Sequence, residues 1–186
     1  YFDHSKIPMI LGVGRLTSQK NFSLLIRAFH MFLKEKEAKL VILGEGPLLE
    51  DLKELSRELN IEDDVYFPGF QKNPYNWMKE AELFVLSSNY EGLGNVLIES
   101  MACGTEVIST DCDSGPYEIL EGGKWGKLCP VDDSRALSSA MLESLNENKI
   151  RDISERASCF NIQGTINGYE SLLEEKQKIA IFLPTL

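Results

Sequence analysis

Short apolar runs alternate with longer amphipathic stretches along this chain. Most of the apolar runs are continuous, as is typical of parallel strands that are buried on both faces. The links between the runs and the amphipathic stretches are short and contain glycine. The pattern predicts strands at MILGVG (9–14), KLVILG (39–44), VYFPG (65–69), LFVLSS (83–88), EVISTD (106–111) and GKLCP (126–130).

Helical periodicity fills the segments between these strands. Apolar residues recur at helical spacing over residues 22–33. A second helix is predicted from Pro47 to Leu59, because proline is favoured in the first turn of a helix. The alternation indicates an α/β fold with a doubly wound parallel sheet, as one domain over residues 1–178, with an apolar tail at 179–186. The other helices are predicted at 94–102, 116–120 and 135–146, with a C-terminal pair after residue 148.

The composition restricts the partners that we expect. The 186 residues fit one domain, and with 43% hydrophobic side chains the chain can bury a core without disulfides or metals. The formal net charge of −10, from 29 acidic and 19 basic side chains, disfavours a nucleic-acid partner. An anionic small ligand remains compatible with this charge, because local basic groups and helix N-termini can hold it.

Cysteine usage and the N-terminus bear on the compartment. The 4 cysteines lack CxxC spacing, and we interpret them as free thiols of a reducing compartment. The N-terminus carries no signal peptide, and no apolar run approaches the ~20 residues of a membrane span. We therefore expect a cytoplasmic protein, with peripheral association at the cytoplasmic face of the membrane left open. The chain starts at Tyr1 rather than Met, so we expect it to be a piece of a longer protein.

We expect the function in the turns that follow the strands, because ligands of doubly wound sheets bind beyond the carboxyl ends of the strands. In the turn after the fourth strand, the amides of Gly92 through Val96 are the unpaired donors of a helix start. With the helix dipole they form an anion site that suits phosphate. Gly92 and Gly94 let the backbone approach such a ligand closely. The unusual turns are GRLTSQKN (14–21), GEGP (44–47), NYEGLGN (89–95) and DCDSGP (111–116).

Two carboxylates, Glu91 and Glu99, flank this anion site. They repel phosphate, but they can accept hydrogen bonds from hydroxyl pairs such as a ribose diol or a sugar ring. Together with the amides they favour a sugar nucleotide as the ligand. A second interpretation stays open, in which one glutamate stabilises the helix start and the other is a solvated loop residue.

Two cations, Arg15 and Lys20, follow the first strand and precede the first helix. At the carboxyl edge of the sheet they can neutralise a diphosphate as it becomes a leaving group, although solvated loop charges are the alternative. The GxG at residues 12–14 is weak evidence for a dinucleotide, because the third glycine is missing and no acidic residue ends the second strand.

The ordered set GRLTSQKN, GEGP, EGLGNVLIE, MACGTEVIS and GPYEIL resembles the C-terminal domain of glycosyltransferase family 4. Enzymes of that family are retaining and have the GT-B fold, in which two Rossmann-like halves face each other across a cleft. The resemblance covers residues 7–173 and implies that this chain is one such half. It departs from the family at Gly94, where proline is frequent, and at Glu106, where proline is usual. The first departure leaves an extra amide and a looser turn, and the second lies away from the ligand.

The resemblance implies a role for the residues of these turns. Arg15 and Lys20 would hold the donor diphosphate and Glu91 the transferred sugar, which makes these three the expected catalytic residues. Glu99 would accept the ribose hydroxyls, and the base would lie at the turn PGFQKN. The implied donor-binding residues are Gly14, Phe70, Gln71, Gly92, Leu93, Gly94, Asn95, Val96 and Glu99.

The resemblance also implies a reaction, the transfer of a sugar from a nucleotide diphosphate sugar, with UDP favoured, to a glycan or lipid-linked acceptor. The diphosphate departs, an oxocarbenium-like centre forms, and the acceptor hydroxyl enters on the same face, with no metal and no cofactor. The cations and amides would stabilise the developing negative charge. The acceptor would bind mainly to an N-terminal half of the same protein, in a pathway such as bacterial polysaccharide or lipopolysaccharide assembly.

Other interpretations are weighed against this one. Asp111, Cys112 and Asp113 spell the DxD metal motif of another glycosyltransferase class, but the strand–helix order and the Arg/Lys pair disfavour a metal there. His4 and His30 form no zinc site with scattered cysteines. A GT-B epimerase or phosphorylase and a noncatalytic nucleotide-sugar-binding module remain as alternatives.

Overall fold

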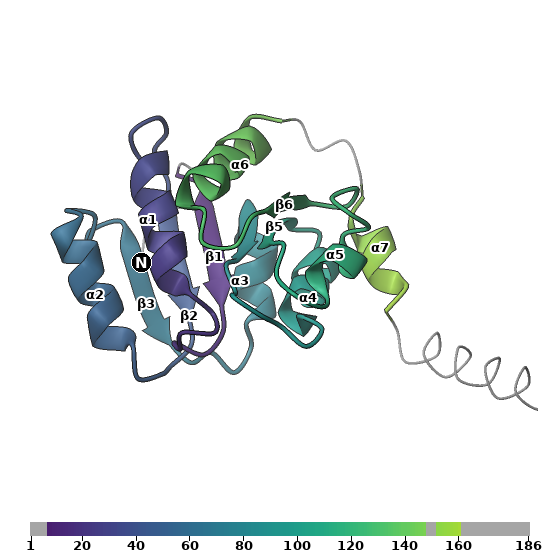
Figure 1. Cartoon of the computed structure of the whole chain (residues 1–186), viewed down its shortest axis with the longest axis horizontal. Coiled ribbons are helices and arrows are strands. Elements are labelled where there is room, and N and C mark those ends of the chain that lie inside the picture. Colours follow the sequence, from purple (N-terminus) through teal and green to yellow (C-terminus); the bar gives the residue numbers. More distant parts are fainter. Residues whose placement is uncertain (1–6, 148–151, 161–186) are drawn as a thin grey trace, which may run out of the picture.

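In the computed structural model, which describes residues 7–147 and 152–160, the predicted strands form a single parallel sheet. Its order within these residues is β3-β2-β1-β4-β5-β6 (Figure 1). The doubly wound α/β fold predicted from the sequence is therefore confirmed. The strands are β1 (Met9–Val13), β2 (Lys39–Leu43), β3 (Val65–Gly69), β4 (Leu83–Leu86), β5 (Glu106–Thr110) and β6 (Lys127–Cys129).

The helices cover both faces of the sheet, and alternate residues of the strands point to the two layers. In β1, Ile10 joins the core cluster formed with α1, α2 and α6, whereas Leu11 joins the cluster formed with α3, α4, α5 and α7. The helices are α1 (Phe22–Phe32), α2 (Leu49–Glu58), α3 (Tyr75–Glu80), α4 (Asn95–Ala102), α5 (Pro116–Ile119), α6 (Ser134–Asn146) and α7 (Ser154–Ser158).

Three predictions about helices were wrong or incomplete. The second helix begins at Leu49 rather than Pro47. Leu48 is its N-cap, whose carbonyl accepts from the amide of Leu52 at 2.9 Å and whose amide donates to the carbonyl of Leu16 at 3.2 Å. Helix α3 was not predicted at all. Of the predicted C-terminal pair, α7 is present, and the rest of that prediction, like the tail at 179–186, lies outside the described residues.

Side-chain caps fix where α1 and α6 begin. The Asn21 side chain accepts from the amide of Leu24, and Asn21 has a left-handed backbone with φ 44°. The Asp133 side chain accepts from the amides of Arg135 and Ala136 at 3.0 and 2.9 Å. Such caps satisfy amides that have no partner within the helix.

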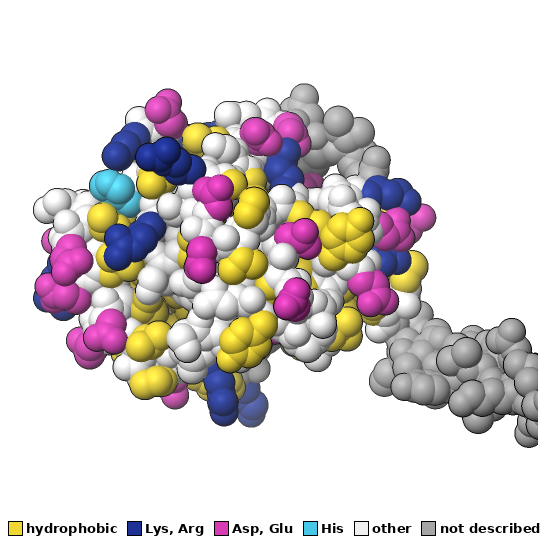
Figure 2. Space-filling model, viewed as in Figure 1, with side chains coloured by type: hydrophobic (Ala, Val, Ile, Leu, Met, Phe, Trp, Pro, Cys, Tyr) yellow, Lys and Arg dark blue, Asp and Glu magenta, His cyan; other side chains and the backbone are white. Residues whose placement is uncertain are grey.

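The cysteines are free, and charges of both signs lie on the surface. All four cysteines lie in the described residues and are free; Cys112 and Cys129 are buried, and Cys159 is exposed. On the face that carries α1 and α6, basic side chains are interspersed with acidic ones (Figure 2). None of the helices in the described residues combines the length and the apolar character needed to cross a bilayer.

Candidate functional site

The strand order places a topological switch point at the carboxyl ends of β1 and β4. These strands are neighbours, but the chain leaves β1 towards β2 and leaves β4 towards β5. At such a switch point the two following loops diverge, and the space between them is the usual ligand site of an open α/β sheet. The loops are residues 14–21 after β1, which is one of the turns selected from the sequence, and residues 87–94 after β4, which overlap the selected turn at 89–95.

Hydrogen bonds join these two loops. The backbone amide of Asn89 donates to the carbonyl of Gln19 at 2.8 Å, and the Asn89 side chain donates to the carbonyl of Ser18 at 2.9 Å. The side chain of Gln19 donates back to the carbonyl of Tyr90 at 3.1 Å. The Ser87 hydroxyl donates to the carbonyl of Lys20 at 2.8 Å. The loops therefore form one bonded unit at the edge of the sheet.

Lys20 and Glu91 form an ion pair within this unit. Lys20 Nζ lies 2.5 Å from Glu91 Oε1, and their side chains are only 15% and 7% exposed. The Ser88 hydroxyl donates to the same Oε1 at 2.6 Å. The sequence selected both residues, but it assigned them to separate tasks and did not predict their pairing. Ser88 was missed; its signal was a hydroxyl directly after a buried strand.

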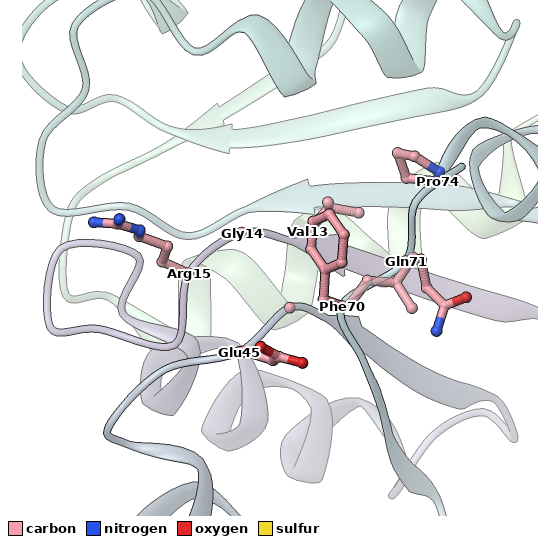
Figure 3. Close-up of a pocket in the computed structure, with 9 residues that line it drawn as sticks. Val13, Gly14, Arg15, Glu45, Phe70, Gln71 and Pro74 are labelled. Carbon is pink, nitrogen blue, oxygen red and sulfur yellow. The ribbon is translucent and has the colours of Figure 1, made fainter.

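A cavity of about 390 Å³ opens beside the first loop, at the carboxyl ends of β1, β2 and β3. Gly14, Arg15, Phe70 and Gln71 line it together, so the structure unites four residues that the sequence selected. Figure 3 shows Arg15 and Gln71 on opposite sides of Phe70. Phe70 is 70% exposed, which leaves an aromatic ring open to a ligand. Glu45 also lines this cavity and was not selected.

A glycine is required in the wall of this cavity. Gly44, in the turn GEGP, has φ +142°, and a Cβ atom there would lie 1.9 Å from the carbonyl oxygen of Gly14. Any side chain would therefore push the turns after β1 and β2 apart. This close contact gives a physical reason for one glycine of the GEGP motif.

The start of α4 presents unpaired amides, as predicted. Gly94 is the N-cap with φ 84°, and the amide of Leu97 donates to its carbonyl at 2.9 Å. The amides of residues 92–96 donate no hydrogen bond to any other residue in the described ranges. The helix starts at Asn95 rather than Gly94. Gly92, Leu93 and Asn95 are exposed, so solvent reaches this end of the helix.

Glu99 does not line the first cavity. It is in the middle of α4 and lines a second cavity of about 420 Å³ together with Leu93, Asn95 and Glu118. Glu91 lines neither of these two cavities. Val96 is half-buried in the first turn of the same helix.

The DxD turn has the features of a loop with one buried thiol. Asp111 and Asp113 are exposed and Cys112 is buried. Burial raises the pKa of the Cys112 thiol, and the negative charge of Glu91 raises it further, so this thiol is protonated at neutral pH. In the described residues, no group of three or more His, Cys, Asp or Glu side chains is arranged to hold a metal ion.

Comparisons with known proteins agree on one family. The family described as "Glycosyl transferases group 1" matches residues 3–158. An N-acetylgalactosamine-N,N'-diacetylbacillosaminyl-diphospho-undecaprenol 4-alpha-N-acetylgalactosaminyltransferase of Campylobacter jejuni is 42% identical over 146 residues, which are 78% of this chain and 40% of that protein.

Solved structures agree with this match. The apo form of the lipopolysaccharide outer core galactosyltransferase WaaB superposes with a TM-score of 0.83 at 26% identity, over 94% of this chain and 51% of that one. A mutant of S. aureus TarM, in complex with fondaparinux, alpha-GlcNAc-glycerol and UDP, superposes with a TM-score of 0.75 at 26% identity, over 92% of this chain and 35% of that one.

The chain thus spans about half, or less, of the length of these proteins. The match covers the sheet, the loops after β1 and β4, and the first cavity. The chain belongs to the glycosyl transferases group 1 family, and its fold is that of the C-terminal half of a GT-B glycosyltransferase.

Proposed function

We propose that this chain is the donor-binding domain of a retaining glycosyltransferase of family 4. Its donor would be a nucleotide diphosphate sugar, with UDP as the favoured nucleotide, and its acceptor a glycan or a lipid-linked sugar. The observation that carries this proposal is the bonded unit of the loops after β1 and β4, which places a buried Lys20–Glu91 pair beside the open amides of α4.

Three groups can hold the diphosphate. The amides of residues 92–96 are free of hydrogen bonds to the described residues and lie at the positive end of a helix dipole. A lysine ammonium has three donors, and Lys20 donates to Glu91 with one of them, so two remain for phosphate oxygens. Arg15 is exposed at the rim of the first cavity.

The carboxylates suit the sugar and the ribose. Glu91 Oε1 accepts from both Lys20 and Ser88, which fixes the carboxylate and leaves Oε2 to accept from a hydroxyl of the transferred sugar. Glu99, at the exposed side of α4, would accept from the ribose diol. The aromatic ring of Phe70 would stack on the base in the first cavity.

The same groups would act on the transition state. As the bond between the sugar and the diphosphate breaks, negative charge accumulates on the leaving group. Arg15, Lys20 and the amides of α4 would stabilise this charge more strongly than they stabilise the bound donor, which lowers the barrier. The acceptor hydroxyl would attack from the side of the departing diphosphate and give its proton to an oxygen of that leaving group, so that the configuration is retained, and no metal is required.

The relatives support the remaining parts of the proposal. The TarM complex contains UDP, and the name of the C. jejuni relative specifies an undecaprenol-linked acceptor. We therefore propose a second, acceptor-binding half in the same protein and a site of action at the cytoplasmic face of a membrane.

Calorimetry of the chain with UDP, in buffer with and without a chelator, tests this proposal. We expect binding in both buffers and at least about 10-fold weaker binding by Lys20→Ala, because a hydrogen bond to a charged group contributes about 1.5–3 kcal/mol. Lys53→Ala, which removes an exposed lysine of α2, is the control and should bind as the unmodified chain does. Strict dependence on a divalent metal would contradict the proposal.

Transfer requires a different test. We expect no sugar transfer by the 186-residue chain alone, and release of UDP from a UDP-sugar by the full-length protein when acceptor is present. Efficient transfer by the chain alone would contradict the proposed division into two halves. Isomerised nucleotide sugar would favour an epimerase, and sugar 1-phosphate formed from a glycan and added inorganic phosphate would favour a phosphorylase.

A further inference from the structure

Three loops of the carboxyl edge meet at the side chain of Asn21. Its Nδ2 donates to Asn89 Oδ1, in the loop after β4, and to Asp132 Oδ1, in the loop after β6, each at 2.8 Å. Its Oδ1 accepts from the amide of Leu24 at 3.2 Å and so caps α1. We propose that Asn21 is a positioning residue of the donor site, which holds the loop of Lys20 against the loop of Glu91. This inference rests on the proposed function.

Asparagine fits the requirements of this position. The backbone is left-handed with φ 44°, a conformation that asparagine tolerates better than most residues. An amide side chain offers two N–H donors and one carbonyl acceptor, and each of them is used here. The Asp132 carboxylate can only accept hydrogen bonds. The Asn21 amide must therefore turn its Nδ2 group towards Asp132 and its Oδ1 towards the start of α1.

Asn89 carries the effect of Asn21 back to the loop after β1. While its Oδ1 accepts from Asn21, its Nδ2 donates to the carbonyl of Ser18 at 2.9 Å. The amide of Asn89 donates to the carbonyl of Gln19 at 2.8 Å. The two residues before Lys20 are therefore both hydrogen-bonded to Asn89, in the loop of Glu91. Without the Asn21 bonds, Asn89 can rotate away and the segment that ends in Lys20 loses its side-chain bond at Ser18, so that the bonds at Gln19 and Lys20 alone hold it to the loop of Glu91.

The consequence for a ligand is a change in apparent affinity. A donor needs the Lys20 ammonium, the α4 amides and Glu91 in one arrangement. If the loops separate for part of the time, the apparent dissociation constant rises by the inverse of the fraction that is correctly arranged. Loss of an interaction as strong as one typical hydrogen bond corresponds to about 5-fold weaker binding.

The variant Asn21→Asp separates positioning from capping. Aspartate keeps the oxygen that caps α1, and it also tolerates a left-handed backbone. It replaces both donors with an acceptor that faces Asp132 and Asn89 Oδ1, so both bonds between the loops are lost. The double variant Asn21→Asp/Asp132→Asn exchanges donor and acceptor and should restore one of these bonds.

The control variant removes a polar contact at the opposite edge of the sheet. Asp64 accepts from Lys39 Nζ at 2.6 Å where β2 begins and just before β3. Asp64→Ala should lower the stability of the fold without changing the carboxyl edge. It therefore distinguishes a general loss of stability from a loss of positioning.

The experiment measures UDP affinity by calorimetry and amide hydrogen exchange without nucleotide for residues 14–21 and 87–94. We expect Asn21→Asp to bind UDP about 5-fold more weakly or worse, with faster exchange in both loops, and the double variant to recover part of both. Asp64→Ala should match the unmodified chain in affinity and in the exchange of these loops. Unchanged affinity and unchanged loop exchange in Asn21→Asp would overturn the inference.

Two further outcomes are informative. If the unmodified chain binds no UDP, the proposed function fails, while faster exchange in Asn21→Asp still shows that Asn21 joins the loops, and unchanged exchange overturns that claim as well. If Asn21→Asp does not fold, Asn21→Gly replaces it, because glycine keeps the left-handed backbone and removes the bonds between the loops.

Discussion

At the scale of single residues, the ion pair between Lys20 and Glu91 connects stability with function. The pair is largely buried, with 15% and 7% of the two side chains exposed. Removing one charge leaves the other in a poorly solvated position, which costs more than an exposed pair would. A substitution that removes the charge of Glu91 should therefore lower the stability of the fold, while the affinity for the diphosphate should not fall.

We predict that Glu91→Gln lowers the free energy of unfolding by about 1–3 kcal/mol, because Lys20 loses its charged partner. UDP affinity should stay the same or increase, since a negative charge beside the diphosphate is removed, while transfer by the full-length enzyme should fall. Urea unfolding, calorimetry and a transfer assay check the three effects.

Glu99→Gln provides the comparison for that variant. Glu99 lies in α4 and lines the second cavity with Leu93 and Asn95, and no hydrogen bond joins it to another described side chain. Glutamine keeps one oxygen that can accept from the ribose but removes the charge, so we expect UDP binding to weaken by about 5- to 10-fold. If the two substitutions weaken UDP binding equally, the proposed division between sugar and ribose is wrong.

Gly94 gives a second residue-scale prediction. Its φ is +84°, and the nearest side-chain atom to a Cβ added there, a methyl of Leu86, would be 3.5 Å away, so an alanine meets strain from the backbone and not from crowding. Gly94→Ala should therefore destabilise the chain by about 1–2 kcal/mol in urea unfolding.

Gly92→Ala is the matched control for Gly94→Ala, because a Cβ at Gly92 meets nothing within 4 Å. Its effect should stay within about 0.5 kcal/mol. Equal effects would show that the turn does not require the left-handed conformation at Gly94.

Sequence reasoning at this scale found residues but not their partners. Lys20, Glu91 and the glycines were selected because their residue types suit a diphosphate sugar. Their pairing was not predicted, because Lys20 and Glu91 are 71 positions apart and meet only after the strands have been ordered in the sheet. Asn21 was not selected either, since its cap and its left-handed backbone are visible only in the structure.

At the scale of elements, a single arginine anchors the short helix α7. Arg156 donates to the carbonyls of Ile119 and Glu118 at 2.9 and 2.7 Å, where α5 ends, and it lies 3.0 Å from a carboxylate oxygen of Glu121. Its guanidinium also lies 4.7 Å from the centre of the Phe160 ring. A cation at a helix C-terminus is favourable, because the last carbonyls lack partners within the helix.

We predict that Arg156→Ala loosens α7 and lowers the free energy of unfolding by about 1–3 kcal/mol. Hydrogen exchange of residues 152–160 should accelerate more than that of the sheet. Arg57→Ala, which removes an exposed pair with Glu54 on α2, should change stability by less than about 1 kcal/mol. Unchanged exchange in α7 would show that its apolar contacts alone hold it.

The pattern of apolar residues predicted the long elements and failed for a short one. All six strands were predicted, although only β1, β2, β4 and β5 are mostly buried. Helix α1 was predicted because its buried residues recur at helical spacing. Helix α3 has six residues, no side-chain cap and one buried side chain, Met78. A residue distant in the sequence stabilises it: the Thr105 hydroxyl donates to the carbonyl of Met78. The local pattern of apolar residues cannot predict such a contact.

At the scale of the whole molecule, the strand order converts separate turns into one site. The turns at 14–21 and 89–95 adjoin because β1 and β4 are neighbours, and the turns after β2 and β3 complete the first cavity. The alternation of elements predicted a parallel sheet, and only the resemblance implied its Rossmann-like order. The separation of Glu99 into a second cavity depends on how α4 packs against α7, which the sequence did not reveal.

The stability of the whole chain should fall in alkaline solution, partly through Cys129 at the end of β6. Burial, reinforced by the carboxylates of Asp133 and Glu143, raises the pKa of this thiol from 9.0 to about 11. The unfolded chain therefore releases this proton near pH 9, while the folded chain keeps it. The stabilisation is complete below pH 9 and is lost as the pH rises towards 11, at no more than about 1.4 kcal/mol per pH unit.

Urea unfolding at pH 8, 9, 10 and 10.5 measures this loss, and Cys129→Ala isolates it. Raised pKa values of Lys39 and Lys127, each beside carboxylates, make both proteins less stable as these lysines lose their protons. This decline is common to the two proteins, whereas the thiol contributes only to the unmodified one. Cys129→Ala should therefore be less stable at pH 8, because its side chain fills less of the core, but it should lose stability less steeply above pH 9. Parallel curves would mean that the thiolate of Cys129 is solvated in the folded chain, which the burial of β6 against α6 contradicts.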